Sequence, residues 1–235
     1  MTRKCWGVFF KDECKITHSL RIVNKNVENP KKSVENQDDS IVIFVKHTRD
    51  TFKTNIMFAT LIRKKVSNEK LANVFINGLW NACNTGFPMV AEFINEDPTF
   101  VASPEVKKDD DFEFVLIVMI GNISLLDGSF EGEQSMEVES LIYEKLAKIY
   151  DMSVFEFKSV VKDYRHLMSR LNAPSKNVIY GMSKTIFDKY TLYNYQDEYF
   201  QRMQVPNPLF LKRLDEIVEN FVWDWEAFFK RYKMQ

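Results

Sequence analysis

The sequence predicts an α+β protein, predominantly α-helical, in which a small β-containing N-terminal part precedes a helical bundle. Two changes of pattern support this fold class. Residues 1–66 contain short apolar runs rich in β-branched and aromatic residues, Cys5–Phe10 and Ile41–Lys46, which are typical of strands. From Ser67 onward the apolar residues recur every three or four positions, which indicates amphipathic helices. We therefore expect a β-rich part over 1–66 and a helical domain over 67–235.

The two predicted strands are separated by a polar stretch near residues 24–40. This stretch contains Pro30 and several Asn, Lys and Glu residues, a composition that favours a loop. We expect the loop to be exposed and mobile. The segment 54–62 fits either a strand or a helix.

Capping residues locate the first helices of the predicted domain. Ser67 is a favourable N-cap for a helix over 68–83, and Pro88 can open a short helix that ends at Glu96. The segment 96–106, with two prolines, is then a linker.

A long apolar run follows three consecutive aspartates, Asp109–Asp111, and Gly128 lies just beyond it. Acidic residues at the front and a glycine past the end favour a helix of about 16 residues. Because the run is apolar on every side, we expect this helix to be central and buried. A buried strand over 112–120 is the alternative.

Further helices are predicted from apolar stripes, and a short helix over 197–203 and a last helix over 209–233 complete the domain. The stripes are Leu141, Ile142, Leu146 and Ile149; Phe157, Val160, Val161, Tyr164, Leu167, Met168 and Leu171, capped by Ser153; and Val178, Ile179, Met182 and Ile186, after Pro174.

The composition is that of a globular protein able to bury a core, with 45% hydrophobic and 28% charged residues. Three widely spaced cysteines predict neither a disulfide framework nor a thiolate metal site, and they favour a reducing, cytoplasmic compartment. The apolar runs are shorter than the about 20 residues of a membrane-spanning helix, so no membrane partner is expected.

Phe, Tyr, Met, Ile, Asn and Lys far outnumber Gly, Ala, Arg and Pro, which indicates an AT-rich gene, such as one from a microbial accessory or antiviral defence locus.

Charge is spread unevenly along the chain, although the net charge is only −1. Residues 1–66 are basic, residues 67–150 are strongly acidic, and residues 151–235 are nearly balanced. Such a distribution can steer an acidic partner to one end of the molecule. Alternatively, the basic and acidic regions neutralise each other within the fold.

Common catalytic signatures are missing from the sequence, which has no GxxxxGK[ST], GxGxxG, GxSxG or HExxH motif. The three histidines have no metal-ligand partner at helical spacing, so the sequence identifies no catalytic residue, metal site or cofactor. A nucleophilic Cys83 would need a histidine from elsewhere in the fold. We interpret Asp109–Asp111 as a helix start rather than as a metal cluster.

A metal-dependent nuclease is the enzymatic alternative. One broad class of nucleases uses an acid followed by a Glu-x-Lys tripeptide on a strand, because carboxylates hold the metal and the lysine faces the phosphate. Of the three Glu-x-Lys matches, only Glu13-Cys14-Lys15, with Asp12 beside it, lies near a predicted strand.

A basic surface is predicted on the helix that follows Ser153. Opposite its apolar stripe, this helix carries several basic side chains, and a short turn separates it from the preceding helix. A basic second helix after a tight turn is what a helix-turn-helix presents to DNA. The candidate nucleic-acid-binding residues are Lys158, Lys162, Arg165, His166 and Arg170.

The last helix carries an aromatic stripe and one ring that does not fit it. At about 100° per residue, Trp223 lies about 200° from Phe221, on the charged face of a continuous helix. An exposed tryptophan favours an interface, whereas the alternative is that the N-terminal part of the chain covers it. The candidate partner-binding residues are Trp223, Phe210, Lys212, Glu219, Glu226 and Lys230.

Three functional hypotheses follow from these patterns. The leading one is a non-catalytic interaction subunit or adaptor of a larger cytoplasmic complex, with a protein partner. Binding of nucleic acid through the basic helix face is the first alternative, and the two are compatible. The metal-dependent nuclease is the second alternative.

Overall fold

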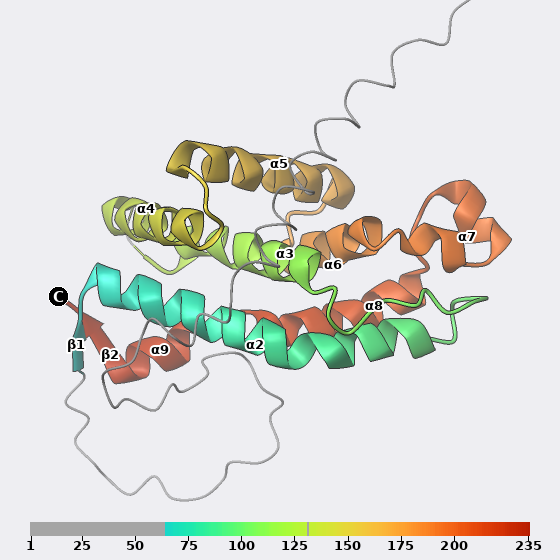
Figure 1. Ribbon diagram of the computed structural model, residues 1–235, viewed down its shortest axis with the longest axis horizontal. Coiled ribbons are helices and arrows are strands. Elements are labelled where there is room, and N and C mark those ends of the chain that lie inside the picture. The colour runs from blue at the N-terminus through green and yellow to red at the C-terminus, as the bar shows by residue number, and fades with distance from the viewer. Residues whose placement is uncertain (1–63, 131) are drawn as a thin grey trace, which may run out of the picture.

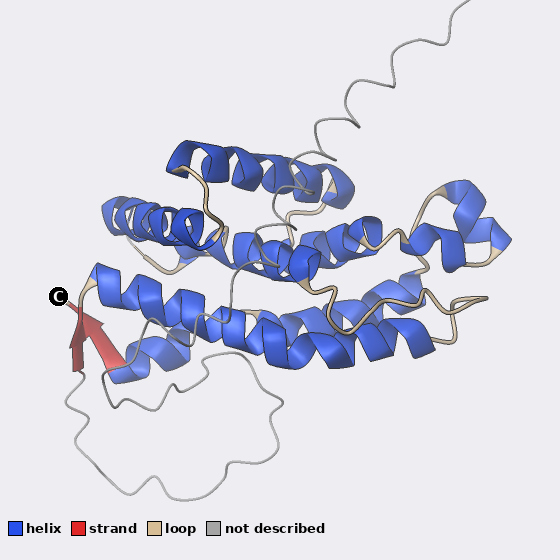
Figure 2. Ribbon diagram, in the orientation of Figure 1, coloured by secondary structure: helices blue, strands red, loops and turns tan. Residues whose placement is uncertain are grey.

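The computed structural model describes residues 64–130 and 132–235, so the strands and the mobile loop predicted within residues 1–63 lie outside the described residues. Within the described ranges the predicted fold class is confirmed, because the chain forms mostly helices and a small two-stranded sheet (Figure 1 and Figure 2). No helix in these ranges is long and apolar enough to cross a membrane. The elements are β1 (Lys64–Val66), α2 (Asn68–Glu96), α3 (Phe112–Ile123), η2 (Leu126–Gly128), α4 (Gly132–Ile149), α5 (Val154–Asn172), α6 (Val178–Lys189), η3 (Leu192–Tyr195), α7 (Glu198–Met203), α8 (Pro208–Val218), η4 (Glu219–Phe221), α9 (Trp225–Arg231) and β2 (Tyr232–Met234).

Helix α3 is the buried centre of the bundle. All 12 of its residues are buried, which confirms the predicted central helix and rules out the strand alternative. The helix ends at Ile123, earlier than expected, and a 3-10 turn follows it. Helices α2, α5 and α6 pack against α3, which lies in the middle of the bundle in Figure 1. Because α3 has no solvent-exposed face, it constrains the positions of its neighbours.

Helix α2 is longer than the sequence predicted. It runs without interruption through Pro88, which was expected to begin a separate short helix. A proline inside a helix costs about 3 kcal/mol, because it removes one hydrogen bond and crowds the preceding turn. The buried stripe nevertheless continues across the proline, since Cys83, Phe87, Val90 and Ile94 are all in the core. Burial of this stripe outweighs the cost of the proline.

The predicted helices α4, α5, α6 and α7 are confirmed, and local capping explains where three of them begin. The Ser153 side chain accepts from the amide of Glu156, whose carboxylate in turn accepts from the Ser153 amide, which makes a complete capping box. The side chains of Asn177 and Asp197 cap α6 and α7, because each accepts hydrogen bonds from backbone amides in the first turn of its helix.

The prediction of one continuous last helix over 209–233 is wrong. The chain leaves the helical conformation at Val222, between η4 and α9. The side chain of Asn122 holds this break: its Nδ2 donates to the Phe221 carbonyl oxygen at 2.9 Å, and its Oδ1 accepts from the Trp223 amide at 2.7 Å. Asn122 is 1% exposed, so these bonds satisfy an amide that burial would otherwise leave unpaired.

Small residues on α2 receive the two aromatic rings at this break. Gly78, Ala82 and Gly86 are spaced four residues apart and therefore lie on one face of the helix. A Cβ added at Gly78 would lie 2.6 Å from Cζ3 of Trp223, and one added at Gly86 would lie 2.7 Å from the ring of Phe221. Both rings thus pack directly on the α2 backbone.

The close approach at Gly78 gives a stability prediction. Replacing Gly78 by Ala forces the buried Trp223 ring to move, and overpacking of this kind costs about 1–3 kcal/mol, more than the improved helix propensity returns. We expect a lower urea midpoint in unfolding followed by circular dichroism. Gly132→Ala is the matched control, because nothing lies within 4 Å of its added Cβ. Equal midpoints for the two variants would contradict the packing of Trp223 on Gly78.

Candidate functional site

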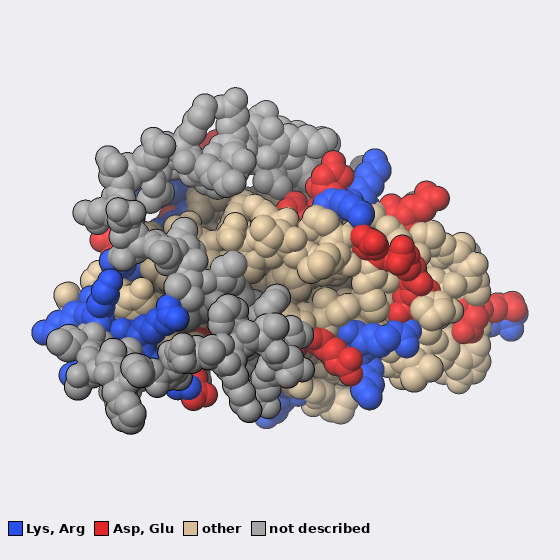
Figure 3. Space-filling view, turned by 90° about the horizontal axis from the view of Figure 1, so that it is seen from below, with Lys and Arg blue, Asp and Glu red and all other residues tan. Residues whose placement is uncertain are grey.

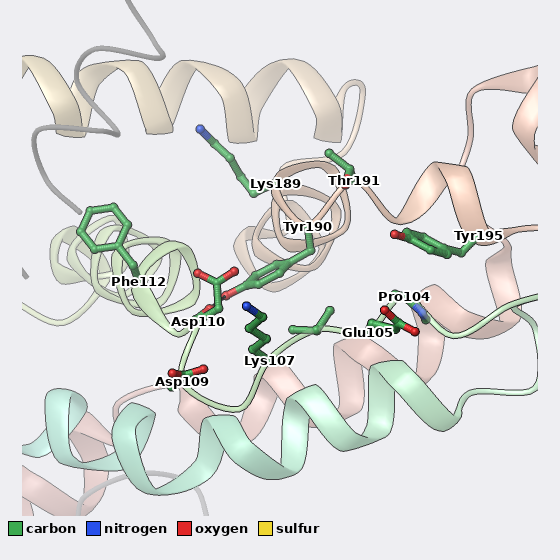
Figure 4. A pocket seen from close by; sticks show the side chains of 11 residues that line it. Pro104, Glu105, Lys107, Asp109, Asp110, Phe112, Lys189, Tyr190, Thr191 and Tyr195 are labelled. Atoms are coloured by element: carbon green, nitrogen blue, oxygen red, sulfur yellow. Dashed lines mark hydrogen bonds between the residues drawn. The ribbon is translucent and has the colours of Figure 1, made fainter. Parts of the chain in front are cut away.

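A cavity of about 650 Å³ lies between the loop that precedes α3 and the end of α6 (Figure 4). Charged side chains of both signs line it, among them Glu105, Lys107 and Asp110. The Tyr190 side chain reaches across toward the loop and donates from its hydroxyl to the Asp110 carbonyl oxygen at 2.6 Å. Burial, together with the Asp110 carboxylate, raises the pKa of Tyr190. The phenol is therefore a hydrogen-bond donor at this site rather than a base.

A buried polar cluster stands beside this cavity and joins α3, α5 and α6. The Tyr164 hydroxyl donates to Oε2 of Glu113 at 2.5 Å, and the Lys189 ammonium lies 3.8 Å from the same oxygen. Lys189 also sits 4.7 Å from the centroid of the Tyr164 ring. Because Glu113 is 5% exposed, its charge has to be compensated locally, and Lys189 is the cation that does so. We read the cluster as a structural link between helices.

The three consecutive aspartates point in different directions. Asp109 and Asp110 line the cavity, whereas the Asp111 carboxylate lies 3.2 Å from the Asn84 amide nitrogen, in the orientation of Asn84 that also accepts from Trp80. Burial and the two neighbouring aspartates raise the pKa of Asp111. Among the described residues no group of three or more His, Cys, Asp or Glu side chains is placed to hold a metal ion.

Cys83 is not placed to act as a nucleophile. Its side chain is fully buried in α2, and burial raises the pKa of the thiol well above its usual range. A nucleophilic cysteine needs an accessible, low-pKa thiolate. His166, the one histidine within the described ranges, is exposed on α5, where it is not buried with Cys83.

The candidate nuclease residues Asp12, Glu13 and Lys15 lie outside the described residues. A second Glu-x-Lys match, which begins at Glu156, has a purely local explanation. Hydrogen bonds from Ser153 to its carboxylate lower the pKa of Glu156, because this carboxylate completes the cap of α5.

Helix α5 exposes four of the five predicted nucleic-acid-binding residues: Lys158, Lys162, His166 and Arg170. Arg165 is the exception, because it is half-buried and faces neighbouring helices. Its Nε donates to the Ser124 hydroxyl at 3.1 Å and its Nη2 donates to Glu139 at 2.7 Å. Helical spacing alone placed Arg165 on the solvent face, and the tertiary fold corrects this.

The prediction that Trp223 is exposed is wrong, because its side chain is 3% exposed. The helix breaks before Trp223, so the angle counted along a continuous helix does not apply, and α2 covers the ring. Phe210 is also buried, with its ring against Phe93 and Phe187. The remaining members of the predicted set are exposed charged side chains: Lys212, Glu219, Glu226 and Lys230.

A different apolar surface is exposed around α7, and we call it the α7 surface. It consists of Tyr199 (65% exposed), Met203 (57%), Val205 (41%) and Leu209 (64%). Helix α7 buries none of its own side chains, and it lies at one end of the bundle in Figure 1. The sequence reasoning located this short helix but did not recognise its exposure. Its signal was a six-residue helix followed closely by two prolines, Pro206 and Pro208, and too short to offer both a core face and a solvent face.

Side-chain hydrogen bonds hold together the two ends of the segment that carries the α7 surface, which protrudes from the bundle. Gln196, which is fully buried, donates from Nε2 to the Val205 carbonyl oxygen at 3.0 Å and accepts at Oε1 from the Asn207 amide at 2.5 Å. Gln201 donates back to the Gln196 carbonyl oxygen at 2.7 Å. These bonds fix the α7 surface without burying its apolar side chains.

No protein-family model, characterised protein or solved structure matches this chain. The described residues offer an exposed apolar surface at α7, a basic face on α5, and cavities lined by polar side chains.

Burial of Cys83 predicts that its thiol resists alkylation in the folded protein. We expect iodoacetamide to modify Cys83 at least about 100-fold more slowly in buffer than in urea, because the reaction needs transient opening of α2. Peptide mapping by mass spectrometry separates Cys83 from the other cysteines. Rapid modification of the native protein would overturn the conclusion that this thiol is not a nucleophile.

Proposed function

We propose that this chain is a non-catalytic interaction subunit, or adaptor, of a larger cytoplasmic complex, and that it binds a protein partner through the α7 surface. One observation carries the proposal: Tyr199, Met203, Val205 and Leu209 expose large apolar side chains from a segment whose helix α7 buries none. Large apolar side chains exposed close together in the sequence mark a candidate docking site.

The α7 segment contributes little apolar burial to the core, yet hydrogen bonds from Gln196 and Gln201 hold its two ends together. A segment that served only to connect η3 with α8 could be shorter and polar. A fixed apolar surface, by contrast, binds a partner with little loss of conformational entropy. The Tyr199 ring offers the kind of rigid anchor that dominates interface energetics.

The charges around the α7 surface favour a protein partner over nucleic acid or a membrane. Glu198 and Arg202 of α7 form an ion pair with each other, so they present no net charge. Figure 3 shows acidic and basic side chains interspersed toward this end of the molecule, whereas basic ones gather at the opposite end. Nucleic acid and anionic membranes both select concentrated basic charge.

The size of the surface favours a different protein over a second copy of this chain. Stable homodimer interfaces are large and strongly apolar, whereas four exposed apolar side chains suit the centre of a smaller, non-obligate interface. We therefore assign the surface to a heteromeric partner with an apolar patch of its own.

A triple variant tests this assignment. Tyr199→Ser, Met203→Gln and Leu209→Gln together should abolish capture of a stoichiometric partner from nuclease-treated cell extract. With the purified partner, calorimetry should show at least about 100-fold weaker binding, because anchor residues carry most of an interface's energy. The stability of the free chain should change little, since all three side chains are exposed.

Phe155→Gln is the matched control. Phe155 is 84% exposed at the start of α5, outside the α7 surface, so its replacement should leave partner binding intact. A partner that binds the triple variant as tightly as the wild type would refute the proposal. So would a wild-type homodimer in analytical ultracentrifugation that the triple variant fails to form, because the occupant would then be a second copy.

Binding of nucleic acid through α5 is a second candidate function. Lys158, Lys162, His166 and Arg170 are exposed along this helix, while Asp163 interrupts them with an opposite charge. The surface suits contacts with phosphates, which need cationic side chains without exact placement. Arg165 is left out of this set, because Glu139 and Ser124 already hold it.

Removing Lys158, Lys162 and Arg170 together, each by replacement with Gln, should weaken binding of duplex DNA and reduce its salt dependence. Each lost phosphate contact lowers the slope of log K against log salt by about 0.9. Lys212→Gln, Lys230→Gln and Lys233→Gln together remove the same number of exposed cations, from α8, α9 and β2, and are the control for net charge. Fluorescence anisotropy at several salt concentrations measures both quantities, and an unchanged slope would exclude the α5 face.

A further inference from the structure

A second cavity, of about 340 Å³, lies where the C-terminal half of α5 meets the first turn of α6 and the end of α3. Two cationic side chains, Arg165 and Lys176, line it, and no aspartate or glutamate does. Its apolar wall includes Met168 and Val178. The volume is at the lower end of the range of small-molecule sites.

The Arg165 guanidinium is held in place at this cavity by its other contacts. Nε is bonded to Ser124 and Nη2 to Glu139, while Nη1 has no hydrogen-bond partner among the described residues. A guanidinium fixed at two nitrogens presents its remaining donors in a set direction, which is how arginine recognises oxyanions.

The first turn of α6 adds backbone donors. The Tyr180 amide is capped by Asn177, but the amides of Val178 and Ile179 have no hydrogen-bond partner within the described part of the chain. Amides at the start of a 12-residue helix attract anionic oxygens. Ser169 and Ser175 line the same cavity.

A buried acceptor distinguishes this cavity from a simple anion site. Asn172 lines it and is 6% exposed; its Nδ2 donates to the Asn177 carbonyl oxygen at 2.7 Å. Its Oδ1 is buried without any hydrogen-bond partner in the described structure. An orphaned buried acceptor costs about 1–3 kcal/mol, which a ligand that brings a hydroxyl donor recovers.

We propose that this cavity binds a small organic phosphate monoester that carries a hydroxyl group near the phosphate, such as a sugar phosphate or a nucleoside monophosphate. Arg165, Lys176 and the α6 amides receive the phosphate, Asn172 accepts from the hydroxyl, and Met168 and Val178 contact the carbon skeleton. The site does not depend on the α7 surface or on the proposed partner.

Calorimetry on the full chain with ribose 5-phosphate as the probe tests the proposal. We expect saturable binding, at least about tenfold tighter than that of inorganic phosphate, because the sugar phosphate brings a separate hydroxyl to Asn172 while its phosphate stays on the cationic side chains. The double variant Lys176→Gln with Ser169→Ala should weaken binding by at least about tenfold. Arg170→Gln is the matched control: it removes a cation from the same helix but from outside the cavity, and should change the affinity less than about twofold.

The alternative results are distinct. The proposal is overturned by the absence of saturable binding, by equal loss in the double variant and in Arg170→Gln, or by equal affinities for ribose 5-phosphate and inorganic phosphate. Chemical-shift changes at Ser169 and Gly181 in NMR spectra locate the bound probe in this cavity. Changes confined to residues outside the cavity would also overturn the proposal. Tighter binding of a 5′-phosphorylated oligonucleotide than of ribose 5-phosphate, lost in the double variant, would support the site and assign its phosphate to a nucleic-acid end.

Discussion

The arrangement of the C-terminal third depends on one buried amide. Asn122 sits on α3, a helix with no solvent-exposed face, so its side chain has to find partners inside the protein. One is the Val118 carbonyl oxygen of its own helix, and the others are the backbone of Phe221 and Trp223, which can offer a carbonyl and an amide only where the chain is not helical. The same break turns both rings onto α2, and it is followed by α9 and then by β2. Strand β2 then pairs in parallel with β1, at the entrance to α2.

Features with local causes could be predicted from the sequence. The buried α3 followed from a long apolar run, and the start of α5 followed from the N-cap residue Ser153. Features with distant causes could not. The bonds from Asn122 join residues about a hundred positions apart, so periodicity continued the last helix through a break that only the fold creates. In the same way, Pro88 indicated a helix start, because the burial of Phe87 and Val90 on either side of it depends on other elements of the fold.

The candidate sites show the same difference between local and distant causes. The exposed basic residues of α5 lie on one helix, so helical spacing was enough to predict their exposure. The partners of Arg165 come from the end of α3 and from α4, and spacing along α5 could not predict them. The cavity lined by Asn172 is formed by residues from three parts of the chain, so no single segment of the sequence predicts it. Trp223 shows the converse: an aromatic residue off the apolar stripe indicated an interface, but the correct inference was that the helix itself ends.

The closed base of the α7 protrusion has a kinetic consequence. Gln196 fixes the segment in the free chain, so the partner that we propose for the α7 surface would not wait for a folding step. The mutually paired charges of Glu198 and Arg202 also provide little long-range attraction. Association would then proceed at the unsteered rate of about 10⁵–10⁶ M⁻¹s⁻¹, nearly independent of ionic strength. The lifetime of the complex, rather than the speed of its formation, would set its affinity.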